Sequence, residues 1–330
     1  MLKEKILKSF YKKNVLVTGG TGMIGRKVIE TLALAGAYIK SVSLDTLKLT
    51  ADAEYVYGDL SDFNLCMELT KGMDYVFHLA GVQGNAYTSK AKPASHFVPI
   101  LMINTNVLEA CRINKAGKVV YVSTIGIYEE AGILRESDFR CDSKPMDFAG
   151  WAKRMGELQI GAYKTQYGME NFSIVAPAHV YGEGDNFDPE VSLVIPSLLY
   201  RLHQGRENPL IVWGDGSAER DFVYSGDVAE GIVLAMYHGT AGELVNLGSG
   251  VGTSIRALIE TLNTFIPFEY VFDTTKPTGV AKRIMDISRA QNMLGYQPKT
   301  TLTEGLKTTW TWYINNPDEH LKKKNHYSDK

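Results

Sequence analysis

The sequence predicts an α/β fold of the Rossmann type, with a doubly wound parallel sheet, in one large domain or in two unequal lobes. Two observations predict it. A short apolar run at residues 15–17 passes through a glycine-rich turn directly into an amphipathic helix at residues 26–34. Strands and helices then alternate through the first half of the chain, which is the pattern of a parallel sheet with both faces covered.

Composition narrows the class of protein. The chain has 330 residues, of which 45% are hydrophobic, so it can bury a full core. Lys and Arg number 35 against 37 Asp and Glu, and this balance predicts no attraction to nucleic acid or membrane. The cysteines, Cys66, Cys111 and Cys141, lack metal or redox spacing, which indicates free thiols, no metal site and a cytoplasmic protein. Residues 1–13 predict a short leading helix, and residues 322–330 a disordered polar tail.

The glycine-rich turn is the first candidate site. Gly19, Gly22 and Gly25 recur at intervals of three between the strand and the helix. The N–H groups at a helix start have no backbone partner, and glycines let a pyrophosphate approach them closely. With Met23 and Ile24 in the same turn, the pattern predicts a dinucleotide site. The alternative is a glycine-rich turn without a ligand.

An acidic residue follows the second expected strand, at residues 37–44. Asp45 lies twenty residues past Gly25, where a carboxylate accepts hydrogen bonds from the adenosine ribose and so favours NAD over NADP. Asp45 could instead simply begin a loop, and Asp52 or Glu54 could be mistaken for it.

The next two strands add further candidate contacts. The third expected strand, from residue 55, ends before Asp59 and Leu60, which could flank an adenine. The fourth, from residue 73, ends in Leu79, Ala80 and Gly81, which are small enough to lie against a cofactor. His78 is interpreted as a packed strand-end histidine rather than a catalytic group.

A helix at residues 95–114 and a fifth strand at residues 118–124 complete a series of motifs. In order they are the glycine pattern, Asp59-Leu60, His78-Leu-Ala-Gly, Val122-Ser-Thr-Ile-Gly-Ile-Tyr and Gly150-Trp-Ala-Lys-Arg. This series resembles the extended short-chain dehydrogenases, the NAD-dependent epimerases and dehydratases of nucleotide sugars, over nearly the whole chain.

The resemblance implies an NAD-binding domain at residues 1–175 and a sugar-nucleotide lobe at residues 176–330, with a return to the sheet around residues 210–250. It also implies a homodimer through helices 95–114 and 151–167, although both helices could simply cover the sheet. Further cofactor contacts follow from it at Val122, Lys153, Ala176, His179 and Val180.

Catalysis in that family needs a Ser or Thr, a Tyr and a Lys. Thr124 and Lys153 match the first and the last, but the tyrosine position, four residues before the lysine, holds Ala149. An alanine has no proton to exchange. Three readings stay open: an engineered knockout, a natural enzyme without the tyrosine, and a binding protein that has lost the chemistry.

The second half resembles the fucose-synthase branch more than the UDP-galactose epimerases. By that resemblance Arg201 and Arg220 would meet a diphosphate and Trp213 would pack on the nucleoside; Asn186, Val194 and Arg283 are further candidates for substrate binding. Alternatively, Arg201 is an unpaired surface arginine and Arg220 forms an ion pair with Asp221.

Departures from that branch narrow the reaction. Gly126 and Leu193 stand where its epimerising Cys and His would be, and Ile125 with Gly126 replaces the acidic pair of the dehydratases. The resemblance therefore implies an NAD-dependent C4 oxidoreductase of a GDP-linked hexose or heptose, without C3/C5 epimerisation. The alternatives are a 4-epimerase and a non-catalytic binding protein. Ile100 also departs from the family, which has asparagine there.

Overall fold

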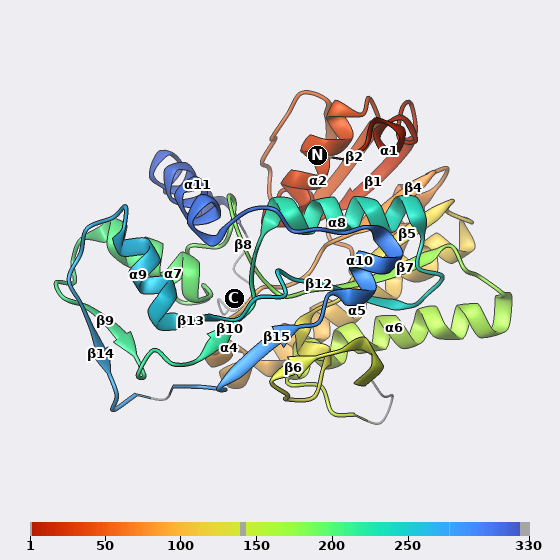
Figure 1. The fold of residues 1–330 in the computed structure, drawn as a ribbon. Coiled ribbons are helices and arrows are strands. Elements are labelled where there is room, and N and C mark those ends of the chain that lie inside the picture. Colours follow the sequence, from red (N-terminus) through yellow and green to blue (C-terminus); the bar gives the residue numbers. More distant parts are fainter. Residues whose placement is uncertain (1, 139–142, 277, 324–330) are drawn as a thin grey trace.

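The computed structural model describes residues 2–138, 143–276 and 278–323. A seven-stranded parallel sheet forms its centre, in the order β12-β7-β5-β4-β1-β2-β3 (Figure 1). The strands are β1 (Asn14–Thr18), β2 (Tyr38–Ser43), β3 (Ala53–Tyr57), β4 (Tyr75–His78), β5 (Lys118–Val122), β7 (Phe172–Pro177) and β12 (Leu244–Leu247). The predicted doubly wound α/β fold is confirmed.

Helices cover both faces of this sheet. Helices α2 and α8 pack together, with α10 against α8, and α3 and α6 each pack against α5 (Figure 1). Their bounds are α2 (Met23–Leu34), α3 (Phe63–Thr70), α5 (Pro93–Ile113), α6 (Phe148–Tyr167), α8 (Ser225–His238) and α10 (Ser288–Leu294). Because both faces are covered, Val15, Leu16 and Val17 are all at most 1% exposed.

The second lobe has its own core and lies beside the sheet (Figure 1). It holds α7 (Val194–Gln204), α9 (Ile255–Asn263), α11 (Leu302–Asn315) and the parallel pair β9 (Leu210–Trp213) and β14 (Tyr270–Asp273). A four-stranded sheet in the order β13-β10-β15-β6 and the pair β11-β8 complete the strands; these are β6 (Ile133–Leu134), β8 (His179–Tyr181), β10 (Glu219–Arg220), β11 (Phe222–Tyr224), β13 (Thr253–Ser254) and β15 (Lys282–Met285).

The remaining elements are short: α1 (Glu4–Lys8), α4 (Ala86–Ala91), and the 3-10 turns η1 (Ile125–Ile127), η2 (Glu136–Asp138) and η3 (Glu319–Lys322). The leading helix is confirmed in α1. None of the described helices is long and apolar enough to cross a lipid bilayer. The described residues also contain no group of three or more metal-ligating side chains.

The boundary expected between the two lobes does not separate their strands. Strand β7 straddles the expected boundary at residue 175, and β6 of the first half pairs with β15 of the second. Of the segment 210–250, only β12 reaches the main sheet; β9 pairs with β14 instead.

Cys66 and Cys111 are buried free thiols, as predicted, whereas Cys141 lies outside the described residues. The prediction of a disordered tail is wrong for Lys322 and Lys323: Lys322 ends η3, and Lys323 donates a hydrogen bond to the Gly184 carbonyl. Residues 324–330 lie outside the described range.

Candidate active site

The glycine-rich turn joins β1 to α2 and packs tightly. Gly19 has φ +69°, and a Cβ there would lie 2.9 Å from Ala80 Cα. A Cβ on Gly25 would lie 2.3 Å from the Gly19 carbonyl oxygen. Gly22, the N-cap of α2, provides no side-chain cap, so the N–H groups of Met23 and Ile24 remain available to an anion. These features fit the pyrophosphate of a dinucleotide.

Asp45 lies at the carboxyl end of β2 and faces the same turn. Its carboxylate accepts hydrogen bonds from Thr21 Oγ1 at 2.7 Å and from Leu47 N at 3.0 Å. A cavity of about 200 Å³ adjoins it. The lining residues are Thr21, Ser43, Asp45, Thr46, Lys48, Tyr55, Val56 and Tyr57. The position suits an adenosine, and Lys48 adds a cation that sequence reasoning missed.

The end of β4 lies beside the glycine turn. Thr18 Oγ1 accepts from the backbone N–H groups of Leu79 and Ala80 at 3.1 Å each. His78 is completely buried; its Nδ1 contacts Thr18 Oγ1 at 2.8 Å and its Nε2 contacts Asn104 Oδ1 at 3.0 Å. Burial lowers its pKa to about 3, so His78 is a neutral packing residue, as predicted.

Thr124 and Lys153 come from β5 and α6. Thr124 follows the end of β5, and its Oγ1 accepts from Gly126 N at 3.3 Å. The Lys153 ammonium donates to the Val122 carbonyl at 2.8 Å and lies 3.8 Å from where a Cβ on Gly81 would be. Burial lowers the pKa of Lys153 to about 8. The lysine therefore stands between the end of β5 and the end of β4.

Ala149 occupies the first turn of α6, one helical turn before Lys153. It packs in an apolar cluster with Val82, Phe97, Ile100, Leu101, Ala152 and Val191. Ile100 is 2% exposed. Ala149 and Ile100, which both depart from the family pattern, therefore share one apolar environment. The nearby tyrosines point elsewhere: Tyr121 Oη donates to the Lys153 carbonyl at 2.9 Å, and Tyr128 Oη donates to Asn246 Oδ1 at 2.7 Å.

A buried acid one turn beyond Lys153 was missed. Glu157 accepts a hydrogen bond from Ser123 Oγ and is 7% exposed. Burial raises its pKa to about 7, although the Ser123 bond opposes this. The spacing of Lys153 and Glu157, four residues apart on a predicted helix, was the signal that could have revealed it.

Two arginines of the second lobe lie side by side. Arg220 of β10 is in register with Arg283 of β15. Arg220 donates to two backbone carbonyls, Glu219 and Val280, at 2.7 Å each, and the buried Nε of Arg283 has no partner among the described residues. Burial and, to a lesser degree, the two guanidiniums together lower the pKa of His179 to about 4. This cationic group suits a diphosphate.

The structure excludes the alternative interpretations of both Arg220 and Arg201. The Asp221 carboxylate is occupied by Ser249 and Gly250 and forms no ion pair with Arg220. Arg201 is not an unpaired surface arginine: its Nε donates to Glu207 Oε1 at 3.0 Å and its Nη2 to the Ile211 carbonyl at 2.7 Å. The structure thus places Arg201 with β9 and Arg220 with Arg283.

The other expected contacts occupy strand ends and loops. Trp213 ends β9, 66% exposed, with the Lys276 ammonium 5.8 Å from its ring centre. Asp59 caps a turn by accepting from Ser61 N at 2.9 Å. The remaining candidates are Leu60 and Ala176, both buried, Val122 at the end of β5, Val180 in β8, Asn186 after it and Val194 at the start of α7.

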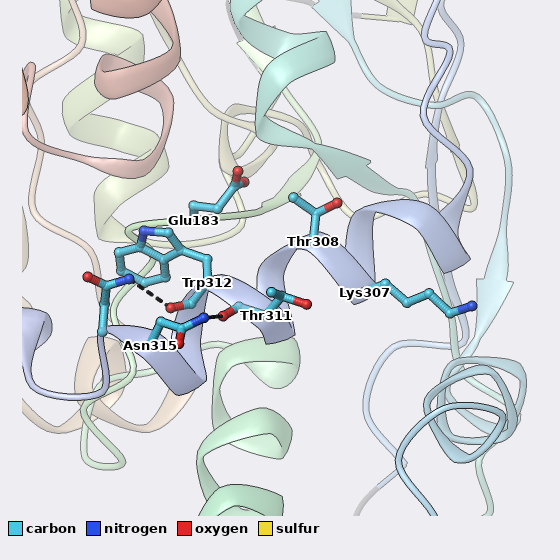
Figure 2. Close-up of a pocket in the computed structure, with 7 residues that line it drawn as sticks. Glu183, Lys307, Thr308, Thr311, Trp312 and Asn315 are labelled. Atoms are coloured by element: carbon cyan, nitrogen blue, oxygen red, sulfur yellow. Dashed lines mark hydrogen bonds between the residues drawn. The ribbon is translucent and has the colours of Figure 1, made fainter.

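An open hollow of about 490 Å³ lies away from these residues. Figure 2 shows it along α11, with Trp312 and Glu183 at one end and Lys307 at the other. None of the predicted site residues lines it. The candidate site is therefore the region between the glycine turn, Lys153 and the Arg220–Arg283 pair.

A Rossmann sheet with a glycine-rich turn, an aspartate after β2 and a buried lysine beside the end of β5 is typical of one class of protein, the NAD-dependent short-chain dehydrogenases. The chain belongs to the NAD dependent epimerase/dehydratase family, whose model matches residues 15–248. NAD is accordingly its cofactor.

Three relatives show which kinds of enzyme this chain resembles. GDP-L-fucose synthase 1 of Arabidopsis thaliana is 30% identical and covers 92% of this chain and 93% of its own. Among solved structures, epimerase Mth375 of Methanothermobacter thermautotrophicus has a TM-score of 0.84 at 26% identity over 96% and 97% of the two chains. UDP-glucose 4-epimerase of Thermotoga maritima, solved with UDP-glucose, has a TM-score of 0.82 at 28% identity over 92% and 99%. The family is thus one of nucleotide-sugar enzymes.

Proposed function

We propose that this protein is an NAD-dependent oxidoreductase acting at C4 of a GDP-linked hexose or heptose, with Lys153 in the role of the missing tyrosine. The observation that carries the proposal is the Lys153 ammonium, buried beside Gly81 and the end of β5. Its pKa, lowered to about 8 by burial, lets it gain or lose a proton near neutral pH.

Each side chain has a separate task in this proposal. Thr124 Oγ1 binds the C4 oxygen and fixes its position. Lys153, as a neutral amine, accepts the hydroxyl proton through a bridging water and returns it as an ammonium in the opposite direction. Bound NAD supplies the hydride acceptor, or in its reduced form the donor. Gly126 and Leu193 carry no proton, so epimerisation at C3 and C5 is not part of the reaction.

The surroundings of Ala149 support a native site without tyrosine. A single engineered substitution that created Ala149 would not account for Ile100. A native site without the tyrosine accounts for both, because the two residues contribute to one apolar cluster. The same cluster also favours a second candidate function, a protein that binds NAD and a nucleotide sugar without catalysis, because it holds no titratable group.

Single-turnover measurement separates these two functions. The protein is mixed with NAD and a GDP-sugar, and the absorbance of reduced nicotinamide is followed. We expect slow hydride transfer that Lys153→Met abolishes and that Ala149→Tyr raises about a hundredfold, because one positioned general base contributes about 10²–10⁴ in rate. Tight binding of both ligands with no transfer in the protein itself or in Ala149→Tyr would favour the binding function. Fast turnover that Ala149→Tyr leaves unchanged would show that the proton leaves by another route.

A further inference from the structure

The segment that follows α11 returns to the glycine-rich turn. Arg26, in the first half of α2, is 6% exposed, and its guanidinium lies 5.0 Å from the ring centre of Trp312 in α11. Arg26 Nη2 points to the Thr21 carbonyl at 3.5 Å and forms an ion pair with Glu319 of η3. The second lobe thus supplies its last described residues to the wall of the dinucleotide site.

Lys323 is the last described residue of this segment. Its ammonium donates to the Gly184 carbonyl and forms no ion pair with a carboxylate in the described ranges. A Cβ on Gly184 would lie 2.2 Å from Arg26 Nε in α2. The carbonyl that accepts the Lys323 hydrogen bond therefore belongs to a loop that packs against α2.

The charges that act on Lys323 locate its ammonium further. Burial lowers the pKa of Lys323, Arg26 lowers it too, and Glu319, Asp185 and Asp45 raise it. Arg26 contacts the Thr21 carbonyl, and Thr21 Oγ1 donates to Asp45 at 2.7 Å, so the ammonium lies near both the first half of α2 and Asp45. The pyrophosphate of a dinucleotide joins these two places.

We propose that Lys323 binds the dinucleotide pyrophosphate, so that the C-terminal segment completes a cofactor site that the glycine turn begins. Arg26, the other cation at this wall, is neutralised by Glu319. Lys323 keeps two donors beyond its bond to Gly184. The inference rests on the family's dinucleotide cofactor and is independent of the reaction at C4.

The test compares ligands that differ in the pyrophosphate. Dissociation constants of NAD, ADP-ribose and adenosine are measured by calorimetry for the full chain, Lys323→Met and Lys322→Met; Lys322 is an exposed neighbour. We expect Lys323→Met to weaken NAD and ADP-ribose about tenfold and adenosine less than about twofold, since one charge-assisted hydrogen bond is lost. Its ADP-ribose affinity also depends less steeply on salt. Lys322→Met leaves all three constants unchanged.

If Lys323 only anchors its segment to the Gly184 loop, the variants give a different result. Lys323→Met would then lower the melting temperature of the ligand-free protein and weaken adenosine as much as ADP-ribose. That result overturns the proposal, as does unchanged ADP-ribose affinity or an equal effect of Lys322→Met. Failure of the full chain to bind ADP-ribose overturns it together with the cofactor assignment, whereas absence of hydride transfer does not affect it.

Discussion

Lys153 and Glu157 show how burial changes the chemistry of single residues. Both lie on one face of α6 below the end of β5, 8% and 7% exposed. Burial moves the pKa of the lysine down to about 8 and that of the acid up to about 7. Each group therefore titrates near neutral pH, where an exposed Lys or Glu does not.

The pH profile of hydride transfer tests the role of Lys153. Oxidation needs the neutral amine, so its rate rises about tenfold per pH unit below the lysine pKa and levels off above about pH 8. Reduction, which needs the ammonium, falls above the same pH. The profile is measured by single turnover in the protein and in Glu157→Gln. If the inflection disappears in Glu157→Gln, the acid rather than the lysine is the titrating group.

We expect Asp45 to determine the choice between NAD and NADP, also at the scale of a single residue. Its carboxylate repels a 2′-phosphate, so NAD binds at least about tenfold more tightly than NADP. Asp45→Asn narrows this ratio, and Lys48→Gln, which removes a cation from the same cavity, widens it. Fluorescence titration with both dinucleotides measures the ratios. Equal or tighter binding of NADP by the unchanged protein would remove Asp45 from the ribose site.

At the scale of elements, close contacts between neighbouring segments shape the site. Helix α2 reaches its strand only because Gly25 lets the Gly19 carbonyl approach it. Helix α6 meets η1 in the same way, since a Cβ on Gly150 would lie 2.1 Å from the Gly126 carbonyl. Asp147 caps α6 by accepting from Gly150 N at 2.7 Å. These contacts hold Thr124 and Lys153 at the same end of the sheet.

Two glycine substitutions test this point. In Gly25→Ala the new Cβ meets the Gly19 carbonyl at 2.3 Å, and we expect a loss of about 1–3 kcal/mol of stability with much weaker NAD binding. Gly161→Ala in α6 is the matched control, because nothing lies within 4 Å of its Cβ; it should gain about 0.5–1 kcal/mol. Urea unfolding and NAD titration measure both. Normal NAD affinity in Gly25→Ala would show that the turn does not bind the pyrophosphate.

At the scale of the whole molecule, the candidate site lies where the two lobes share strands. Strand β6 of the first half pairs with β15, and β15 pairs with β10, which places Arg283 beside Arg220. The neighbouring His179 belongs to β8, immediately after β7 of the main sheet. Helices α5 and α6 pack on each other within one chain, and the homodimer through them stays a prediction.

The arrangement of the lobes predicts which arginine matters for the nucleotide. Arg220→Ala should cost about 2–4 kcal/mol of GDP affinity, because the diphosphate loses a charged donor. Arg201→Ala should change it little, since Glu207 and the Ile211 carbonyl already hold that guanidinium. Calorimetry with GDP and UDP measures both variants, and GDP should bind more tightly than UDP. A preference for UDP would move the protein to the epimerase branch.

The resemblance to the family revealed the missing tyrosine, whereas the sequence by itself determined the order of strands and helices in the first half and the glycine turn with Asp45. These features depend on residues close together in the chain, where periodicity and spacing are direct consequences of strand and helix geometry. Tertiary structure alone decided the partners of the buried charges. Glu157 against Ser123, Arg283 beside Arg220, and Lys323 against the Gly184 loop all depend on which surfaces meet after folding. Burial, which changes the proton affinity of Lys153, arises only from that packing.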